Sequence, residues 1–146
     1  MAPRTLLLVE DNPDDVEMAV LAFSKADLGI QIDHAVDGVK ALEYLLPPST
    51  TAARATKALP SVVLLDLKLP RISGLQVLER LRADPRTRYL PVVVLTSSSH
   101  PEDVVSSYDL GCNSYVRKPV DFERFLEVAR YLGTYWLDVN EAAANP

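Results

Sequence analysis

Acidic side chains, a hydroxyl and a lysine stand at the ends of short apolar runs, and their types indicate metal and phosphoryl chemistry. The residues are Glu10, Asp11, Asp66, Thr96 and Lys118. Carboxylates that lie together repel one another unless one is protonated or a cation joins them. Oxygen ligands suit a hard ion such as Mg²⁺, which keeps several of its waters and engages phosphate groups. The set therefore predicts a magnesium site, provided that the fold brings these residues together.

Within that set, Asp66 is the candidate nucleophile. Its carboxylate could attack phosphorus and form an acyl phosphate, while a metal ion offsets charge on the transferred group. The Lys118 ammonium would pair with one phosphoryl oxygen, and the Thr96 hydroxyl would donate a hydrogen bond to another. Each residue alone could be an ordinary turn or surface residue, but that explanation needs a separate coincidence for every one of them.

Short apolar runs predict the strands that position these residues. Continuous stretches rich in Val and Leu are typical of strands covered on both faces, as in parallel sheets. One run alternates apolar and polar residues and therefore indicates an edge strand. The predicted strands are 6–9, 30–35 (the alternating run), 62–65, 92–95 and 115–116.

Helical patterns fill the segments between these runs. The first apolar stripe is Val16, Ala19, Val20 and Phe23. Asp14 or Asp15 is its predicted N-cap. Further helices are predicted at 39–46, 74–83 and 102–110, and from Phe122 onward with Asp121 as N-cap. Strands that alternate with helices predict a (βα)5 fold, with a parallel sheet covered on both faces. In such a sheet ligands bind beyond the carboxyl ends of the strands, which is where the candidate residues stand.

Length and charge limit what the chain can be. Its 146 residues fit one domain. The net charge of −5 argues against nucleic-acid binding, which needs a basic face. Cys112 is the only cysteine, so no intrachain disulfide can form. The apolar run near the N-terminus is too short for a signal peptide or a membrane span, so we expect no membrane contact and a cytoplasmic location.

The sequence resembles the receiver domains of bacterial response regulators over about residues 4–132. The matching pieces are VEDNPDD (9–15), LLDLKLPRISG (64–74), VVVLTSS (92–98) and SYVRKP (114–119). The resemblance implies a flavodoxin-like, doubly wound α/β fold with strand order 2-1-3-4-5. It also implies a signalling protein rather than an enzyme, in which Asp66 accepts a phosphoryl group from a sensor histidine kinase.

The resemblance assigns the metal ligands. Asp11 and Asp66 would bind Mg²⁺, with the backbone carbonyl of Lys68 as a third protein ligand and Glu10 acting through water. Lys68 stands at a position where receivers differ and where the side chain can alter the lifetime of the phosphoryl group. The sequence does not predict in which direction Lys68 would alter it.

The resemblance also assigns a switch. Thr96 and Lys118 would contact the phosphoryl group, and Tyr115 would turn inward when Thr96 does. The Lys118–Pro119 peptide would be cis. Gly74 corresponds to the glycine of the loop that follows the acceptor.

A narrower resemblance points to a partner. The VEDNPDD opening, the long Pro47–Pro60 loop and the ending YLGTYWL are similar to single-domain regulators paired with bacterial phytochrome histidine kinases. We therefore expect a receiver domain with an extended last helix at 1–137, a short tail at 138–146 and no output domain. Output would then be a protein contact or self-association.

Aromatic residues at the end of the last helix are candidates for that contact. They are Tyr131, Tyr135 and Trp136. Trp136 could pack back onto its own domain. Alternatively, the three could form a symmetric homodimer interface, where aromatic anchors are enriched, together with the fourth predicted helix and the fifth strand. The phytochrome resemblance favours the dimer.

Three alternatives to a phosphorylated receiver remain. A magnesium-dependent aspartyl-phosphate phosphatase of the haloacid dehalogenase type would carry a second Asp two residues after the nucleophile, where this chain has Lys68. A nucleotide-binding module would need a glycine-rich turn after the first strand, and the turn here contains no glycine. A receiver-like interaction module that is never phosphorylated would not need the acidic residues and Lys118.

Overall fold

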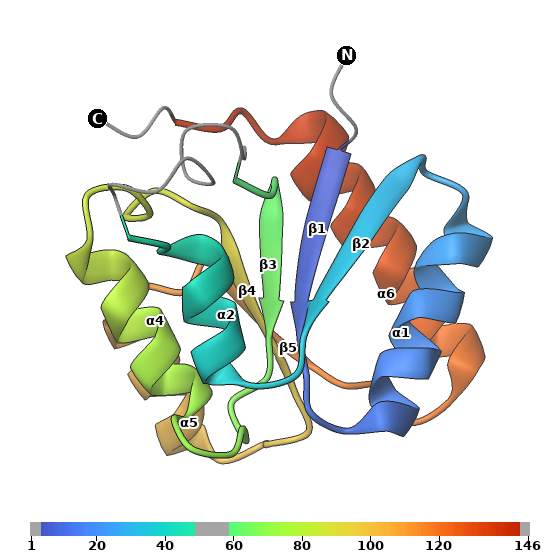
Figure 1. The fold of residues 1–146 in the computed structure, drawn as a ribbon. Helices are drawn as coiled ribbons and strands as arrows, with labels where there is room; N and C mark the ends of the chain where they lie inside the picture. The colour runs from blue at the N-terminus through green and yellow to red at the C-terminus, as the bar shows by residue number, and fades with distance from the viewer. Residues whose placement is uncertain (1–3, 49–58, 144–146) are drawn as a thin grey trace.

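The computed structural model describes residues 4–48 and 59–143. Within these ranges the chain forms one five-stranded parallel sheet with strand order β2-β1-β3-β4-β5 (Figure 1). The strands are β1 (Arg4–Val9), β2 (Ile30–Ala35), β3 (Val62–Leu65), β4 (Val92–Thr96) and β5 (Ser114–Arg117). The predicted fold class and strand order are confirmed, and the alternating run forms an edge strand. Most of the predicted Pro47–Pro60 loop lies outside the described residues.

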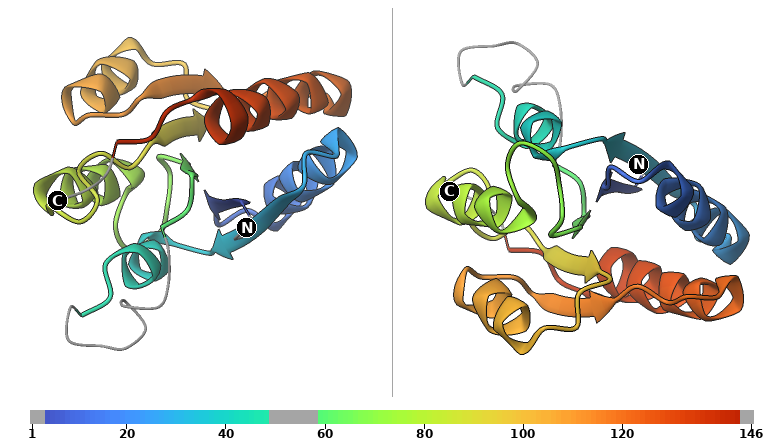
Figure 2. Two further views of the ribbon diagram at one scale, coloured as in Figure 1. Left: turned by 90° about the horizontal axis from the view of Figure 1, so that it is seen from above. Right: turned by 90° about the horizontal axis from the view of Figure 1, so that it is seen from below.

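Helices cover both faces of the sheet (Figure 2). α1 and α6 pack side by side on one face, and α2, α4 and α5 lie on the other. The helices are α1 (Pro13–Ala26), α2 (Gly38–Leu45), α4 (Gly74–Ala83), α5 (Pro101–Asp109) and α6 (Phe122–Gly133). A π-helical segment, η1 (Thr134–Val139), continues α6. No helix among the described residues is long and apolar enough to cross a membrane.

The central strands are buried on both faces because successive side chains of a strand point to opposite sides. Leu7 and Val9 of β1 pack in one apolar cluster with residues of α2 and α4. Leu6 and Leu8 pack in a second cluster with residues of α1 and α6. This two-sided burial explains the continuous apolar runs, and it anchors the strand ends that carry the acidic residues.

The N-cap prediction for α1 is wrong. Asn12 is the N-cap, and its side-chain oxygen accepts hydrogen bonds from the backbone N–H groups of Asp14 and Asp15 at 2.9 and 3.3 Å. The helix begins at Pro13, which suits the first position because its missing N–H would have no helical partner there. Asp14 and Asp15 therefore lie inside the first turn, where negative charge interacts favourably with the helix dipole.

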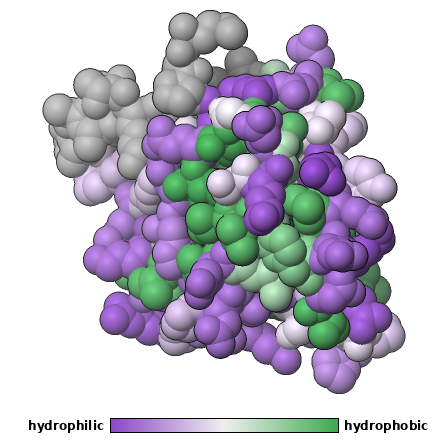
Figure 3. Space-filling view, turned by 90° about the vertical axis from the view of Figure 1, so that its right-hand side faces the viewer, coloured by the Kyte–Doolittle hydropathy of each residue, from purple (hydrophilic) through white to green (hydrophobic). Residues whose placement is uncertain are grey.

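The side of the molecule that carries α1 is not uniformly polar. Figure 3 shows apolar side chains gathered near the middle of this side, with hydrophilic ones around them. On α1 itself, Val20 and Leu21 are 41% and 47% exposed. The face that α1 turns away from the core therefore carries apolar as well as charged residues.

Candidate functional site

The carboxyl ends of β1 and β3 lie side by side and bring two acidic residues together. Val9 pairs with Leu65 in the parallel register, so Glu10 and Asp66, which follow them, reach the same edge of the sheet. The Asp66 backbone N–H donates to the Val9 carbonyl at 3.1 Å and extends the ladder by one step. Glu10 is 3% and Asp66 6% exposed. Two buried carboxylates side by side are unfavourable without a cationic partner.

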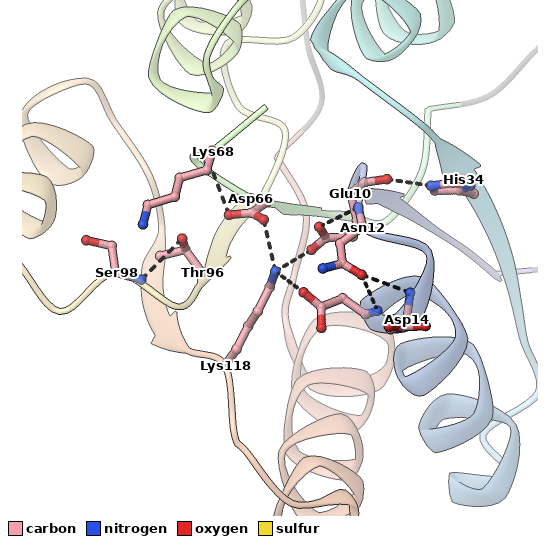
Figure 4. Close-up of polar contacts among 10 residues, drawn as sticks. Glu10, Asn12, Asp14, His34, Asp66, Lys68, Thr96, Ser98 and Lys118 are labelled. Carbon is pink, nitrogen blue, oxygen red and sulfur yellow. Dashed lines mark hydrogen bonds and ion pairs between the residues drawn. The ribbon is translucent and has the colours of Figure 1, made fainter. Parts of the chain in front are cut away.

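Lys118 supplies that partner from the end of β5. Its ammonium nitrogen, Nζ, lies 2.5 Å from Glu10 Oε1, 2.9 Å from Asp66 Oδ2 and 2.8 Å from Asp15 Oδ2. Figure 4 shows the Lys118 side chain extending up to this group of carboxylates. The Lys118 backbone N–H donates to the Thr96 carbonyl at 2.8 Å. This bond fixes the base of the side chain at the edge where β4 and β5 end.

Burial and pairing shift two of these pKa values. Burial alone would lower the pKa of Lys118, but the hydrogen bonds that its ammonium donates to Asp15, Glu10 and Asp66 raise the pKa above its usual value, so the ammonium stays charged. Burial raises the pKa of Glu10 to about 7. The hydrogen bond from Lys118 lowers this pKa, whereas the charge of Asp66 raises it further. Around neutral pH Glu10 is therefore divided between its protonated and ionised forms.

The acidic residues form a group whose carboxylate oxygens could serve as ligands of a divalent cation. Carboxylate oxygens of Glu10, Asp11 and Asp66 all lie within 4.8 Å of one another; we call these three residues the acidic cluster. Asp11 is exposed, whereas Glu10 and Asp66 are buried. Oxygen-only ligands with one side open to water match the preference of Mg²⁺, which retains part of its hydration shell. The residues present therefore fit a magnesium ion.

The loop after β3 holds the second oxygen of Asp66. The Lys68 backbone N–H donates to Asp66 Oδ1 at 3.3 Å, and the Lys68 side chain is exposed. Farther along, the Gly74 N–H donates to the Leu67 carbonyl at 2.9 Å. A Cβ atom on Gly74 would lie 2.2 Å from the Asp66 carbonyl oxygen, so this position requires glycine. The loop thus packs its backbone tightly against the candidate acceptor.

Thr96 and Tyr115 both contact Ser98. Thr96 is fully buried at the end of β4, and its hydroxyl accepts a long hydrogen bond, 3.5 Å, from the Ser98 N–H (Figure 4). The half-buried Tyr115 donates its hydroxyl to the Ser98 carbonyl at 3.0 Å. Ser98 also bonds through its own hydroxyl to Asp103 at the start of α5. The coupled movement of Thr96 and Tyr115 stays a prediction, and Ser98 is the link between them that sequence reasoning missed.

Asp15 and His34 are two further residues whose contacts the sequence analysis did not foresee. Asp15 was considered only as a helix cap, but from the first turn of α1 its carboxylate pairs with Lys118 Nζ at 2.8 Å. His34 lies on the edge strand β2, and its Nε2 is 2.7 Å from the Glu10 carbonyl oxygen (Figure 4). This contact ties the edge strand to the backbone of the acidic cluster.

The peptide bond between Lys118 and Pro119 is trans, so the cis prediction is wrong. The trans isomer is the intrinsically favoured one, by about 0.5–1 kcal/mol for a bond to proline. The Lys118 side chain reaches all three carboxylates from the trans backbone.

The aromatic end of the molecule is partly packed. Trp136 packs against the apolar cluster that β1, β3 and β4 form with α1 and α6, and it is half-buried. Its ring meets the ring of Tyr135 edge to face, with centroids 4.8 Å apart. Tyr135 and Tyr131 stay 48% and 65% exposed. Trp136 thus packs on its own domain, which was the first of the two predictions for it. The two tyrosines remain exposed and available to a partner.

Comparison with known proteins adds to this geometry. A family model described as the response regulator receiver domain matches residues 6–130. That range includes every residue of the acidic cluster together with Thr96, Tyr115 and Lys118.

Three solved structures are similar over nearly the whole chain. The bacteriophytochrome response regulator AtBRR is 41% identical, with a TM-score of 0.76 and full coverage of both chains. The phosphorylated cyanobacterial phytochrome response regulator RcpA is 29% identical, with a TM-score of 0.87, over 98% of this chain and 100% of its own. The Mn²⁺-bound form of the response regulator Rcp1, a protein of Synechocystis, is 28% identical, with a TM-score of 0.83, over 97% and 100% of the two chains.

Proposed function

This chain belongs to the response regulator receiver domain family, and from that membership we propose that Asp66 is the residue that accepts the phosphoryl group. Phosphorylation of an aspartate is the mechanism by which this family signals in two-component systems. The observation that carries the assignment is the position of Asp66. It is buried at the end of a central strand, with one oxygen on Lys118 Nζ and the other on the Lys68 N–H.

Magnesium is the ion that we propose for the acidic cluster. Glu10, Asp11 and Asp66 would hold it, with the backbone carbonyl of Lys68 as a further ligand. The proximity of the three carboxylates supports this assignment, as does the Mn²⁺ in the related Rcp1 structure. When bound, the ion would offset negative charge on the transferred phosphoryl group.

Asp66, Lys118 and Thr96 would each have a separate role in the phosphoryl transfer. The Asp66 carboxylate would form a bond to phosphorus while the bond from phosphorus to the donor nitrogen of a phosphohistidine breaks. Lys118 would then pair with a phosphoryl oxygen in place of the carboxylate oxygen that it contacts now. The Thr96 hydroxyl would turn from the Ser98 N–H to donate to a second oxygen.

Those two contacts would supply much of the free energy that a switch needs, and all of it at the upper end of their range. Charge-assisted hydrogen bonds are worth about 1.5–3 kcal/mol each, and a shift of a two-state equilibrium from 1:99 to 99:1 needs about 5.5 kcal/mol. The movement of Thr96 away from Ser98 would release the loop that Tyr115 holds through the Ser98 carbonyl. The surface around α5 and β5 would change as a result.

We propose a sensor histidine kinase of the bacteriophytochrome type as the phosphoryl donor. The similarity to AtBRR, a bacteriophytochrome response regulator, and to RcpA, a phytochrome response regulator, supports this partner. We also propose a homodimer through the face of α5, β5 and α6, supported by the exposed Tyr131 and Tyr135. Light scattering should then give twice the 16.1 kDa of one chain. A cytoplasmic location, the usual setting of receiver domains, stays a prediction.

Phosphorylation of Asp66 can be tested by intact-mass measurement. The protein is incubated with Mg²⁺ and acetyl phosphate beside Asp66→Asn and a matched Asp14→Asn control on the exposed first turn of α1. We expect one added phosphoryl mass in the wild type and in the control, none in Asp66→Asn, and none when EDTA removes the metal. Absence of the adduct in all three proteins, with Mg²⁺ bound, would instead identify an interaction module that is not phosphorylated.

A further inference from the structure

Lys118 has more carboxylate partners than its proposed role requires. Glu10 from the end of β1, Asp66 from the end of β3 and Asp15 from the first turn of α1 each lie within 2.9 Å of its ammonium nitrogen. A lysine ammonium has three N–H donors, so these three contacts use all of them. The side chain is 11% exposed, and little of this group is left to water.

Two of the three partners also belong to the acidic cluster. A divalent ion that binds Glu10 and Asp66 would take the same carboxylates that now hold Lys118. It would also repel the ammonium, because Lys118 contacts the same two carboxylates and like charges interact strongly in a partly buried site. The metal and the lysine therefore compete for the two buried carboxylates.

Asp15 stands outside that competition. Among the described residues, it is the one ion-pair partner of Lys118 that is not part of the acidic cluster. Its carboxyl group is 35% exposed, so its charge costs less to maintain than that of Glu10 or Asp66. The Asn12 cap accepts from the Asp15 N–H and fixes the turn from which the side chain reaches Lys118.

We propose that Asp15 is a positioning residue that holds the Lys118 ammonium while Glu10 and Asp66 engage the metal. This inference rests on the proposed function, since it assumes the magnesium site. Two effects act in the same direction. Asp15 adds negative charge near the metal, and it offers the ammonium an alternative partner, so that the ion need not leave Lys118 unpaired. Without Asp15, Lys118 would stay on the two cluster carboxylates and oppose metal binding.

Magnesium titration by calorimetry, with no phosphoryl donor present, tests this role. Asp15→Asn keeps the size of the side chain and removes its charge. We expect its Kd for Mg²⁺ to rise about tenfold, the equivalent of one charge-assisted contact. Asp14→Asn removes the same charge from the same helical turn but from a residue that is not among the partners of Lys118. Its Kd should change by no more than about twofold, as for an exposed charge.

A third variant separates charge from shape. Asp15→Glu retains the carboxylate on a side chain one methylene longer, and its Kd should lie closer to that of the wild type than to that of Asp15→Asn. Circular dichroism of the metal-free variants checks that each is folded.

Three results would overturn the inference: wild-type affinity in Asp15→Asn, an equal loss in Asp14→Asn, or no Mg²⁺ binding by the wild type. The mass measurement on Asp66 is independent of the first two. An adduct on Asp66 together with unchanged Mg²⁺ affinity in Asp15→Asn would leave the proposed function standing and remove only the role of Asp15.

Discussion

At the scale of single residues, Glu10 is an acidic side chain of the site whose ionisation the fold opposes. It is 3% exposed, and burial raises its pKa from 4.5 to about 7. Lys118 compensates only in part, because Asp15 and Asp66 share the same ammonium. A group whose pKa is higher in the folded state stabilises the protein fully below its unfolded pKa, and this stabilisation is lost as the pH rises through the folded value.

This shift predicts a pH-dependent stability for the metal-free protein. Between pH 4.5 and values above 7, the contribution of Glu10 to the free energy of unfolding should fall by on the order of 3 kcal/mol. Glu10→Gln cannot ionise and should lose less stability over this range than the wild type. Urea unfolding in EDTA at pH 5 and pH 8 measures the difference between the two proteins.

The control for Glu10 lies on the solvent-exposed side of α1. Glu17 is exposed, and Glu17→Gln should follow the wild type at both pH values. If Glu10→Gln and the wild type lose the same stability between pH 5 and pH 8, burial of Glu10 is not what opposes its ionisation.

At the scale of elements, the connection from β3 to α4 positions the acceptor through backbone contact. α4 begins at Gly74, immediately against the Asp66 carbonyl and Leu67. Ser73 caps the helix through a capping box with Gln76, so the helix start cannot shift easily to make room. The location of Asp66 thus depends on the absence of a side chain eight residues later.

A methyl group at this position should disturb the site. Gly74→Ala would place Cβ 2.2 Å from the Asp66 carbonyl oxygen and 2.7 Å from Leu67 Cα, both backbone atoms. We expect a loss of about 1–3 kcal/mol in the free energy of unfolding, typical of overpacking, and slower phosphorylation of Asp66 by acetyl phosphate. Urea unfolding and time-resolved intact mass measure the two effects.

Gly133→Ala is the matched control, because the added Cβ would there meet a side chain and not the backbone. Its Cβ would meet Leu28 Cδ1 at 2.4 Å, the far end of a side chain that can change rotamer. Gly133 ends α6, away from the acidic cluster. This variant should keep the wild-type phosphorylation rate. Equal rates in Gly74→Ala and the wild type would show that the β3–α4 connection does not position the acceptor.

At the scale of the whole molecule, the amino and carboxyl ends of the strands have different roles. The carboxyl ends carry the acidic cluster, whereas Arg82 joins three segments near the start of β4. Its guanidinium donates to the Gly111 carbonyl at 2.9 Å and to the Thr87 carbonyl and Asn113 Oδ1 at 3.0 Å. Asn113 in turn accepts from the N–H of Val92, the first residue of β4. Stability and phosphorylation should therefore respond separately to mutation.

Arg82→Met tests this separation. It would remove three hydrogen bonds and leave their acceptors unpaired, so the free energy of unfolding should fall by at least about 2 kcal/mol. Phosphorylation of Asp66 should continue at the wild-type rate at a temperature where the variant is folded. Arg80→Met on the exposed face of α4 is the control and should change neither quantity. A slower Asp66 reaction in Arg82→Met, with Arg80→Met unaffected, would show that the two ends are coupled.

The amino-acid sequence by itself determined the parallel sheet and the edge at which the chemistry gathers. Strands covered on both faces must be apolar throughout, and the carboxyl ends of parallel strands lie at one edge, so the sequence alone predicts that Glu10, Asp66 and Lys118 lie together. The alternating run 30–35 likewise predicted the edge strand, because an edge strand of this kind needs burial on only one of its two faces.

Contacts that depend on a side chain's exact reach were decided only by the tertiary structure. Whether Asn12 or Asp15 caps α1 depends on where the backbone first becomes helical, and local propensity favours both residues. That choice left Asp15 free to reach Lys118, more than a hundred residues away in the chain. Trp136 could equally have faced a partner or its own core. Trp136 instead packs on its own apolar cluster, whose members come from strands and helices far apart in the sequence, so no local pattern predicts the contact.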